Sequence, residues 1–214
     1  MIKVKICGVR TVDDALKCVE CGADAVGMLL APSPRRIPVE RARDIVRRLP
    51  PFVTPVIVLM PSTVEEAVWA VREVGPGAIQ LHGDEPPEAL EEIRRRIPGV
   101  RIIKAVHVGG GGEVEKARAY EDVADAILLD TLSPNRGGSG HTHDWAVSAK
   151  VVNSVGKPVI LAGGLRPENV AEAVRTVRPY AVDVASGVES PALVKDAELM
   201  RMFIGNARGA LDGR

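Results

Sequence analysis

The chain has 214 residues, of which 46% are apolar and 26% charged. This composition excludes a disordered, collagen-like or small disulfide-stapled protein. Basic and acidic residues both total 28, so the net charge is zero and we expect no nucleic-acid partner. No apolar run approaches the ~20 residues of a membrane-spanning helix, and the N-terminus lacks the apolar region of a signal peptide. With only three cysteines, we expect a cytoplasmic protein without membrane association.

Short apolar runs alternate with longer amphipathic segments along the whole chain. Continuous apolar runs are typical of parallel strands buried on both faces, and apolar residues three and four apart predict helices. In chain order we predict strand Lys3–Cys7, helix Val12–Glu20, strand Ala25–Leu30, helix Val39–Leu49, strand Pro55–Leu59, helix Thr63–Val74, strand Ala78–Leu81, helix Pro87–Ile97, strand Arg101–Val106, helix Glu113–Tyr120, strand Ala126–Asp130, helix Asp144–Val155, strand Pro158–Leu161, helix Pro167–Val177, strand Ala181–Ala185 and a last helix near Lys195–Leu211.

Prolines and glycines mark several of the helix ends. Pro167 is predicted at the first helical position, where its missing N–H is not needed. Gly22, Gly75, Gly99 and Gly156 fall just past helix ends, so we expect the left-handed conformation at each.

The alternation predicts one α/β domain. Eight units of about 27 residues with no long insertion favour a single (β/α)8 barrel over residues 1–214, with right-handed parallel crossovers. An open doubly wound sheet is the alternative for the same pattern. No linker or composition shift divides the chain.

Reactive side chains gather at the carboxyl ends of the predicted strands, where barrels of this kind form their sites. Cys7, His82 and Asp130 end or follow strands one, four and six. Gly163-Gly164 and Ser186-Gly187 follow strands seven and eight, the usual phosphate site of the fold. Glycines let backbone N–H groups approach an anion, and a helix N-terminus adds a favourable dipole. Phosphate binding is therefore preferred over the alternative, tight turns that need positive φ.

An ordered set of short motifs resembles the phosphoribosylanthranilate isomerase family, and the resemblance extends from Met1 to beyond Asn206. The motifs are Lys5-Ile6-Cys7-Gly8, Gly22-Ala23-Asp24-Ala25-Val26-Gly27, Ser33-Pro34-Arg35, Gln80-Leu81-His82-Gly83, Leu129-Asp130-Thr131, Gly137-Gly138-Ser139-Gly140 with Asp144-Trp145, Ala162-Gly163-Gly164-Leu165 with Pro167-Glu168-Asn169-Val170, and Val182-Asp183-Val184-Ala185-Ser186-Gly187-Val188-Glu189 with Lys195-Asp196.

The resemblance implies an Amadori rearrangement in tryptophan biosynthesis. N-(5-phosphoribosyl)anthranilate, a small phosphosugar, becomes 1-(2-carboxyphenylamino)-1-deoxyribulose 5-phosphate without a metal or organic cofactor. By the same resemblance Cys7 is the general base and Asp130 the general acid. The base must be partly thiolate and the acid must hold a proton. We hypothesise that a helix N-terminus and phosphate-site dipoles lower the pKa of the Cys7 thiol, and that burial keeps Asp130 protonated.

Three further residues are candidates for binding the substrate. The resemblance matches Arg35 to an arginine that grips the anthranilate carboxylate, and a planar guanidinium suits that role. Arg36 is the adjacent alternative, interpreted as a solvated side chain. Asp183 is a candidate for the ribosyl hydroxyls or a structural carboxylate of the barrel. His82 lines the mouth or serves as a hydrogen-bonded residue of an interior layer.

Four other features receive weaker interpretations. Cys18-Val19-Glu20-Cys21 has no second pair of ligands, so we expect partly buried helix cysteines instead of a metal or redox site. We likewise expect no cluster of histidine and carboxylate ligands at the strand ends. The run Gly109–Gly112 is predicted to be a slack surface turn, with a mobile lid edge as the alternative. Residues 133–143 are the better candidate for a lid.

Two other functions remain open at this stage. The first is a phosphoribosyl aminoaldose isomerase of histidine synthesis, or a barrel that accepts both substrates, and either would share the fold and the rearrangement. The histidine-pathway family, however, resembles a design with two aspartates and has a carboxylate at the position where this chain has Cys7. A non-catalytic phosphosugar-binding barrel would keep the glycine loops and has no need of Cys7 with Asp130. The oligomeric state is open, with a homodimer as one option.

Overall fold

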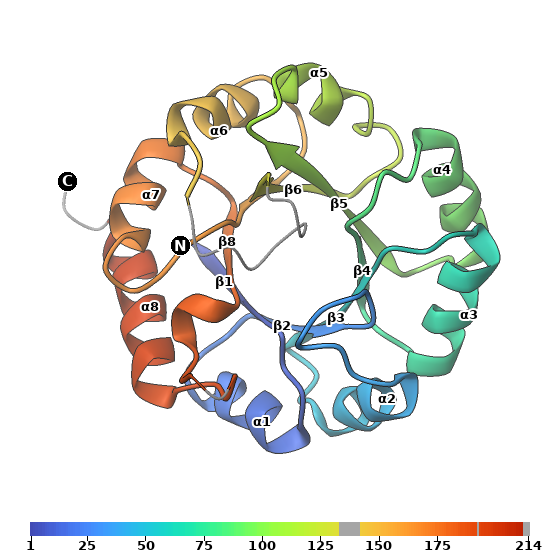
Figure 1. Ribbon diagram of the computed structural model, residues 1–214, viewed down its shortest axis with the longest axis horizontal. Coiled ribbons are helices and arrows are strands. Elements are labelled where there is room, and N and C mark those ends of the chain that lie inside the picture. The colour runs from blue at the N-terminus through green and yellow to red at the C-terminus, as the bar shows by residue number, and fades with distance from the viewer. Residues whose placement is uncertain (133–141, 192, 212–214) are drawn as a thin grey trace.

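The computed structural model describes residues 1–132, 142–191 and 193–211. Eight parallel strands form a closed barrel in sequence order, from β1 to β8, and the helices surround it as a ring (Figure 1). The predicted (β/α)8 barrel is therefore confirmed. The elements are β1 (Lys3–Cys7), α1 (Val12–Glu20), β2 (Ala25–Leu29), α2 (Val39–Arg48), β3 (Thr54–Leu59), α3 (Val64–Val74), β4 (Ala78–Leu81), α4 (Pro87–Arg96), β5 (Arg101–Val108), α5 (Glu113–Arg118), β6 (Ala126–Thr131), α6 (Trp145–Val152), β7 (Val159–Leu161), α7 (Val170–Val177), β8 (Ala181–Val184), the 3-10 helix η1 (Ser186–Val188) and α8 (Ala197–Gly209).

Strand parity decides which side chains face the inside of the barrel. Successive side chains of a strand point to opposite faces. On β1, Val4 and Ile6 pack into the apolar layer beneath the helices, whereas Lys5 and Cys7 have the opposite parity. A second, smaller apolar cluster lies inside the barrel and contains Val56, Ala78, Ile103, Ala105, Ala126, Leu128, Ile160, Ala162 and Ala181.

Polar residues continue these inward rows toward the carboxyl ends of the strands. On β6, Asp130 shares the parity of Leu128, and its register partner on β5 is His107. On β8, Asp183 shares the parity of Ala181 and is the register partner of Lys5. The apolar filling thus ends partway along the barrel, and ionisable side chains occupy the remaining interior.

Two predicted helix ends are wrong by three residues, and the other helix ends differ from the prediction by no more than two. Helix α7 begins at Val170, not at Pro167. Asn169 holds a turn before it, since its Oδ1 accepts the N–H of Arg166 and its Nδ2 donates to the Gly164 carbonyl. Gly156 does not adopt positive φ, although the glycines predicted after α1, α3 and α4 do. The physical reason is that helix α6 ends four residues earlier, at Val152.

The four-glycine segment is not slack. The carboxylate of Glu113 accepts hydrogen bonds from the N–H groups of Gly109 and Gly111, at 3.0 and 2.8 Å. Lys116 closes the loop by donating to the Gly111 carbonyl. Most of the proposed lid, residues 133–141, lies outside the described residues. Within the described ranges, no helix is long and apolar enough to cross a membrane.

Candidate active site

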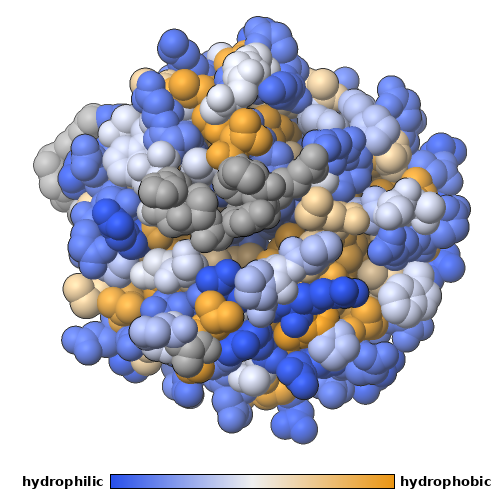
Figure 2. Space-filling view, in the orientation of Figure 1, coloured by the Kyte–Doolittle hydropathy of each residue, from blue (hydrophilic) through white to orange (hydrophobic). Residues whose placement is uncertain are grey.

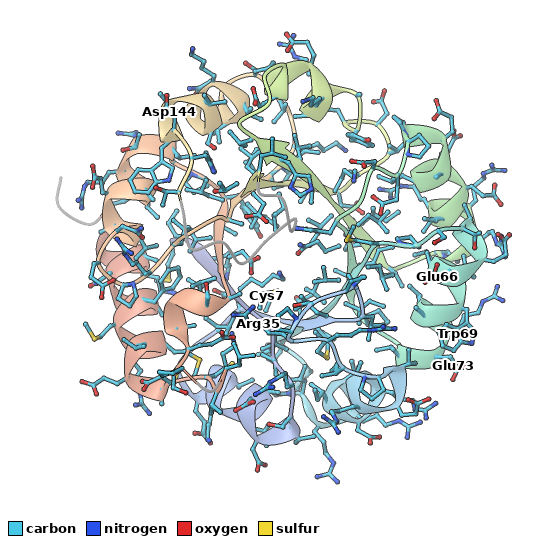
Figure 3. All side chains as sticks on the ribbon, in the orientation of Figure 1. Cys7, Arg35, Glu66, Trp69, Glu73 and Asp144 are labelled. Carbon is cyan, nitrogen blue, oxygen red and sulfur yellow. The ribbon has the colours of Figure 1, made fainter. Side chains whose placement is uncertain are left out.

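A cavity of about 500 Å³ opens at the carboxyl ends of the strands. Of the residues singled out in the sequence, Cys7, Arg35, His82, Asp130, Gly163, Gly164, Asp183 and Ser186 line it, and Gly187 does not. Figure 3 shows Cys7 and Arg35 toward the centre of the barrel. On the same face, several apolar patches lie around the centre with hydrophilic side chains between them, and hydrophilic side chains predominate at the periphery (Figure 2).

Cys7 is the last residue of β1 and is buried. Gly27 on the neighbouring strand makes room for it, because a Cβ there would lie 2.8 Å from the Cys7 Sγ. Burial raises the pKa of the Cys7 thiol, and the nearby Lys5 ammonium, which lowers it, offsets only part of that effect. The expected lowering of this pKa is therefore wrong, because loss of water around the thiolate outweighs the nearby positive charges.

Lys5 occupies the inward position two residues before Cys7 and is almost fully buried. Its Nζ lies 3.0 Å from Asp183 Oδ1 and 2.9 Å from Gln80 Oε1. Burial alone would lower the pKa of Lys5, but Asp183 and Cys7 outweigh it and raise that pKa. Lys5 is thus a buried cation between the thiol and a carboxylate, and Asp183 serves as its counterion.

Gln80 and His82 continue this network toward Asp130. Gln80 Nε2 lies 2.9 Å from His82 Nδ1, and His82 Nε2 lies 3.4 Å from Asp130 Oδ2. The other carboxylate oxygen of Asp130 accepts the N–H of Thr131 at 2.9 Å. A continuous row of polar groups therefore connects the surroundings of Cys7 with Asp130.

The donors and acceptors in this row fix the tautomer of His82. A lysine ammonium only donates, so the Gln80 atom that faces Lys5 must be the carbonyl oxygen. The amide nitrogen of Gln80 then donates to His82 Nδ1, which must carry a lone pair. In a neutral imidazole the proton consequently resides on Nε2, the nitrogen that faces Asp130.

Arg35 lies after β2, where its guanidinium meets the carboxylate of Glu189. Arg35 Nε donates to Glu189 Oε1 at 2.8 Å and Nη2 to Oε2 at 2.6 Å. Lys195 donates to the same carboxylate at 2.7 Å. Burial alone would raise the pKa of Glu189, but Arg35 and Lys195 hold it below its usual value. Arg36 is exposed and does not line the cavity.

The glycines after β7 and β8 bring two loops into contact. At φ +86° a Cβ on Gly163 would lie 2.2 Å from Thr131 Oγ1, so only glycine fits there. A Cβ on Gly187 would lie 2.0 Å from the Leu165 carbonyl oxygen. Gly187 therefore permits close packing of the two loops, while Gly163, Gly164 and Ser186 face the cavity.

The expectation that strand-end histidines and carboxylates do not cluster is wrong. One potential ligand atom each from His82, His107 and Asp130 lies within 4.8 Å of the others, because β5 extends to Val108 instead of ending at Val106. The tautomer of His82 presents an N–H to this cluster instead of a lone pair. With His82 so protonated, only His107 and Asp130 remain as ligands, too few for a structural zinc site.

Sequence reasoning missed Lys5, Gln80 and Glu189 as members of the site. Parity was the available signal for two of them, since Lys5 is two residues from Cys7 and Gln80 two residues from His82. Glu189 follows the short helix η1, and sequence spacing gives no indication that it reaches Arg35.

A closed barrel with a cavity of ionisable side chains at its strand ends is the architecture of (β/α)8-barrel enzymes. A family model described as N-(5'-phosphoribosyl)anthranilate (PRA) isomerase matches residues 4–206. The chain therefore belongs to the phosphoribosylanthranilate isomerase family, whose members are aldose–ketose isomerases of tryptophan biosynthesis.

Individual relatives agree with this assignment. An N-(5'-phosphoribosyl)anthranilate isomerase of Methanocella arvoryzae is 59% identical over 210 residues, covering 97% of this chain and 99% of the relative. The crystal structure of the Thermotoga maritima isomerase is 45% identical, with a TM-score of 0.89 over 98% of this chain and 100% of that one. Another isomerase structure, in complex with reduced 1-(o-carboxyphenylamino)-1-deoxyribulose 5-phosphate, is 42% identical with a TM-score of 0.85, and covers 98% of this chain and 100% of that one.

Proposed function

We propose that this chain, as one barrel domain over residues 1–214, converts N-(5'-phosphoribosyl)anthranilate into 1-(2-carboxyphenylamino)-1-deoxyribulose 5-phosphate. The observation that carries the proposal is a thiol and a carboxyl facing one cavity from different strands, Cys7 on β1 and Asp130 on β6. Membership of the isomerase family supports the substrate class, and the complex of a related structure with a reduced product analogue supports a phosphosugar ligand.

Asp130 acts as the general acid. Its carboxyl proton passes to the furanose ring oxygen as the bond from C1 to that oxygen breaks, and the bonding electrons stay with the oxygen. The lone pair of the anilino nitrogen forms a C1–nitrogen double bond, which gives an iminium ion. Thr131 N–H already donates to one oxygen of the Asp130 carboxyl group, so the carboxylate that forms has a partner in place.

Cys7 acts as the general base. Its thiolate removes the C2 proton of the iminium ion, and the released electrons form the C1–C2 double bond of an enolamine. The enol then becomes the ketone as its hydroxyl proton returns to the Asp130 carboxylate and the Cys7 thiol gives its proton to C1, so both groups regain their starting protonation states and the net reaction is an isomerisation. Lys5 is the buried cation beside Cys7, and it favours the thiolate electrostatically.

The remaining lining of the cavity suits the two ends of this substrate. Arg35 and the apolar side chains of Leu29, Val58 and Met60 all line the cavity, which fits an aromatic ring that carries a carboxylate. Gly163, Gly164 and Ser186 line the same cavity and bind the phosphate through backbone N–H groups. Asp183 is held by Lys5 and contacts the ribosyl hydroxyls.

The experiment is a metal-free fluorescence assay with freshly made phosphoribosylanthranilate. Wild type is compared with Cys7→Ala and Asp130→Asn, and Cys21→Ala on the half-buried thiol after α1 is the matched control. We expect the anthranilate fluorescence to fall with wild type and Cys21→Ala and to persist with the other two variants. Turnover near the wild-type rate in either variant would contradict its assigned role. If the wild type is folded but does not turn over phosphoribosylanthranilate, the histidine-pathway substrate is favoured and is assayed next with the same protein. If neither substrate is turned over, a phosphosugar-binding protein is favoured.

A further inference from the structure

We propose that Gln80 is a positioning residue of this reaction, which sets the tautomer of His82 so that an N–H faces the general acid Asp130. The proposal rests on the proposed function, in which Asp130 gives up its proton. Gln80 does not need to touch the reacting atoms for this role. It acts through His82.

The order of hydrogen bonds leaves Gln80 one orientation. Lys5 Nζ lies 2.9 Å from Gln80 Oε1 and also holds Asp183, so reversing the amide would place an N–H group against a buried ammonium. Gln80 is 2% exposed, and bulk water does not replace a lost partner there. The amide therefore donates to His82 Nδ1, at 2.9 Å.

His82 transmits this choice to Asp130. With Nδ1 accepting, the imidazole proton is on Nε2, which lies 3.4 Å from Asp130 Oδ2. Thr131 N–H occupies the other oxygen. The carboxylate formed when Asp130 transfers its proton thus meets two preset N–H donors, and the longer contact has room to shorten as charge develops.

The opposite tautomer would reverse this assistance. His82 would then present the Nε2 lone pair to Asp130, and two lone pairs would face each other after proton transfer. Gln80 consequently selects one of the two neutral tautomers of its neighbour.

If Gln80 had only a structural role, it would fill the barrel between the apolar cluster and the cavity. Catalysis would then not depend on which of its amide atoms faces His82. The variant Gln80→Glu separates the two roles. It keeps the shape of the side chain and an oxygen toward Lys5, but replaces the donor to His82 Nδ1 by an acceptor. We expect the proton of His82 to move to Nδ1.

The test combines nuclear magnetic resonance with kinetics. Two-bond proton–nitrogen spectra of histidine-labelled protein report the tautomer, and the His82 signals are those missing in His82→Gln. We expect wild type to carry the proton on Nε2 and Gln80→Glu to carry it on Nδ1. In that variant we expect kcat to fall about 10- to 100-fold with KM within about twofold, the pattern for losing a donor that acts in the transition state. The same change from amide to acid at the exposed Asn153 should alter neither the tautomer of His82 nor kcat and KM.

Several results would overturn the proposal. One is a wild-type His82 with its proton on Nδ1, which needs no variant to be measured. Another is a Gln80→Glu protein with the reversed tautomer and unchanged kcat, in which case the proposed function would stand and the role of Gln80 would fail. If Gln80→Glu does not fold, Gln80→Met removes the donor without adding charge, and unchanged kcat there would count equally against the proposal. Absence of turnover in wild type would refute the function while leaving the tautomer measurement valid.

Discussion

The Arg35 guanidinium and the Glu189 carboxylate form a bidentate ion pair between the segment after β2 and the segment after β8. Lys195 donates to the same carboxylate and also to the Ala185 carbonyl. Two cations on one buried carboxylate leave this group of side chains with a net positive charge. Glu189 therefore orients Arg35 at the cavity wall without cancelling the attraction for an anionic substrate.

Arg35→Lys should raise KM for phosphoribosylanthranilate far more than it lowers kcat. An ammonium has no planar fork, so it fails to bind Glu189 and a substrate carboxylate in the same geometry. We expect kcat/KM to fall about 10- to 100-fold, the worth of one charge-assisted hydrogen bond. Steady-state kinetics measure the effect, and Arg36→Lys on the exposed neighbour is the control. Equal losses in the two variants would argue against a specific role for Arg35.

The raised pKa of Cys7 predicts an alkaline limb in the pH–rate profile. A general base works only when deprotonated, so kcat/KM should rise with pH through an apparent pKa above the ordinary thiol value of about 8.5. The inactivation rate by iodoacetamide should follow the same limb, because the thiolate is the reactive form. A limb below the ordinary thiol value would show that burial does not raise this pKa, whereas a limb in kcat/KM that differs from the one in the iodoacetamide rate would show that this thiol does not act as the base in the free enzyme.

The fold was predictable because each element carries its own periodic signal. Strand β1 and helix α1 have the predicted bounds, since parity and capping are local properties. Thr11 caps α1 by accepting from the Asp14 N–H. The start of α7 was not predictable from Pro167, because the side chain of Asn169 holds a competing turn.

The site was predictable only as a set of strand ends. The cavity does bring Cys7, Asp130 and Arg35 together. Neither the direction nor the size of the pKa shifts was predictable. The pKa of Cys7 depends on the burial of the thiol and on the position of the Lys5 ammonium, and both are properties of the three-dimensional structure. The pairing of Arg35 with Glu189 joins residues 154 positions apart, and no local pattern encodes such a contact.

Gly27→Ala tests whether Cys7 needs the space beside it. The added Cβ would lie 2.8 Å from Cys7 Sγ and 3.0 Å from Lys5 Cε, so the thiol must shift. We expect a loss of about 1–3 kcal/mol of unfolding free energy from overpacking and a fall in kcat of up to about 100-fold from misplacement. Gly77→Ala is the matched control, since its nearest contacts would be 3.4 Å away. Unchanged kcat in Gly27→Ala would imply that the position of the thiol is not critical.

Lys104→Met should destabilise the barrel by breaking another buried ion pair. Lys104 Nζ lies 2.7 Å from Glu85 Oε2 and 2.6 Å from the Gly83 carbonyl, with both charged side chains almost fully buried. Removing the cation leaves the Glu85 carboxylate without its ion-pair partner, and we expect a loss of about 3–5 kcal/mol in urea unfolding. Lys116→Met, on an exposed lysine that also bonds a loop carbonyl, should change stability by no more than about 0.5 kcal/mol. Similar small losses in both variants would mean that Glu85 is readily rehydrated.

Cys18 should make the stability of the protein fall at alkaline pH. Its side chain is fully buried, with Sγ 3.5 Å from Met200 Sδ, and burial raises the pKa of the thiol from 9.0 to about 12. Between those values the native protein keeps a proton that the unfolded chain has lost. The free energy of unfolding therefore decreases as pH rises from about 9 to about 12, by up to about 1.4 kcal/mol per pH unit from this group.

Cys18→Ala should remove that contribution, whereas Cys21→Ala, at a thiol that is only partly buried, should leave most of it in place. The measurement is the free energy of urea unfolding at several pH values, taken as the difference between each variant and wild type. Other alkaline groups titrate alike in all three proteins and cancel in this difference. A difference between Cys18→Ala and wild type that stays constant over this pH range would indicate that the buried thiol does not hold its proton, and that water reaches it between α1 and α8.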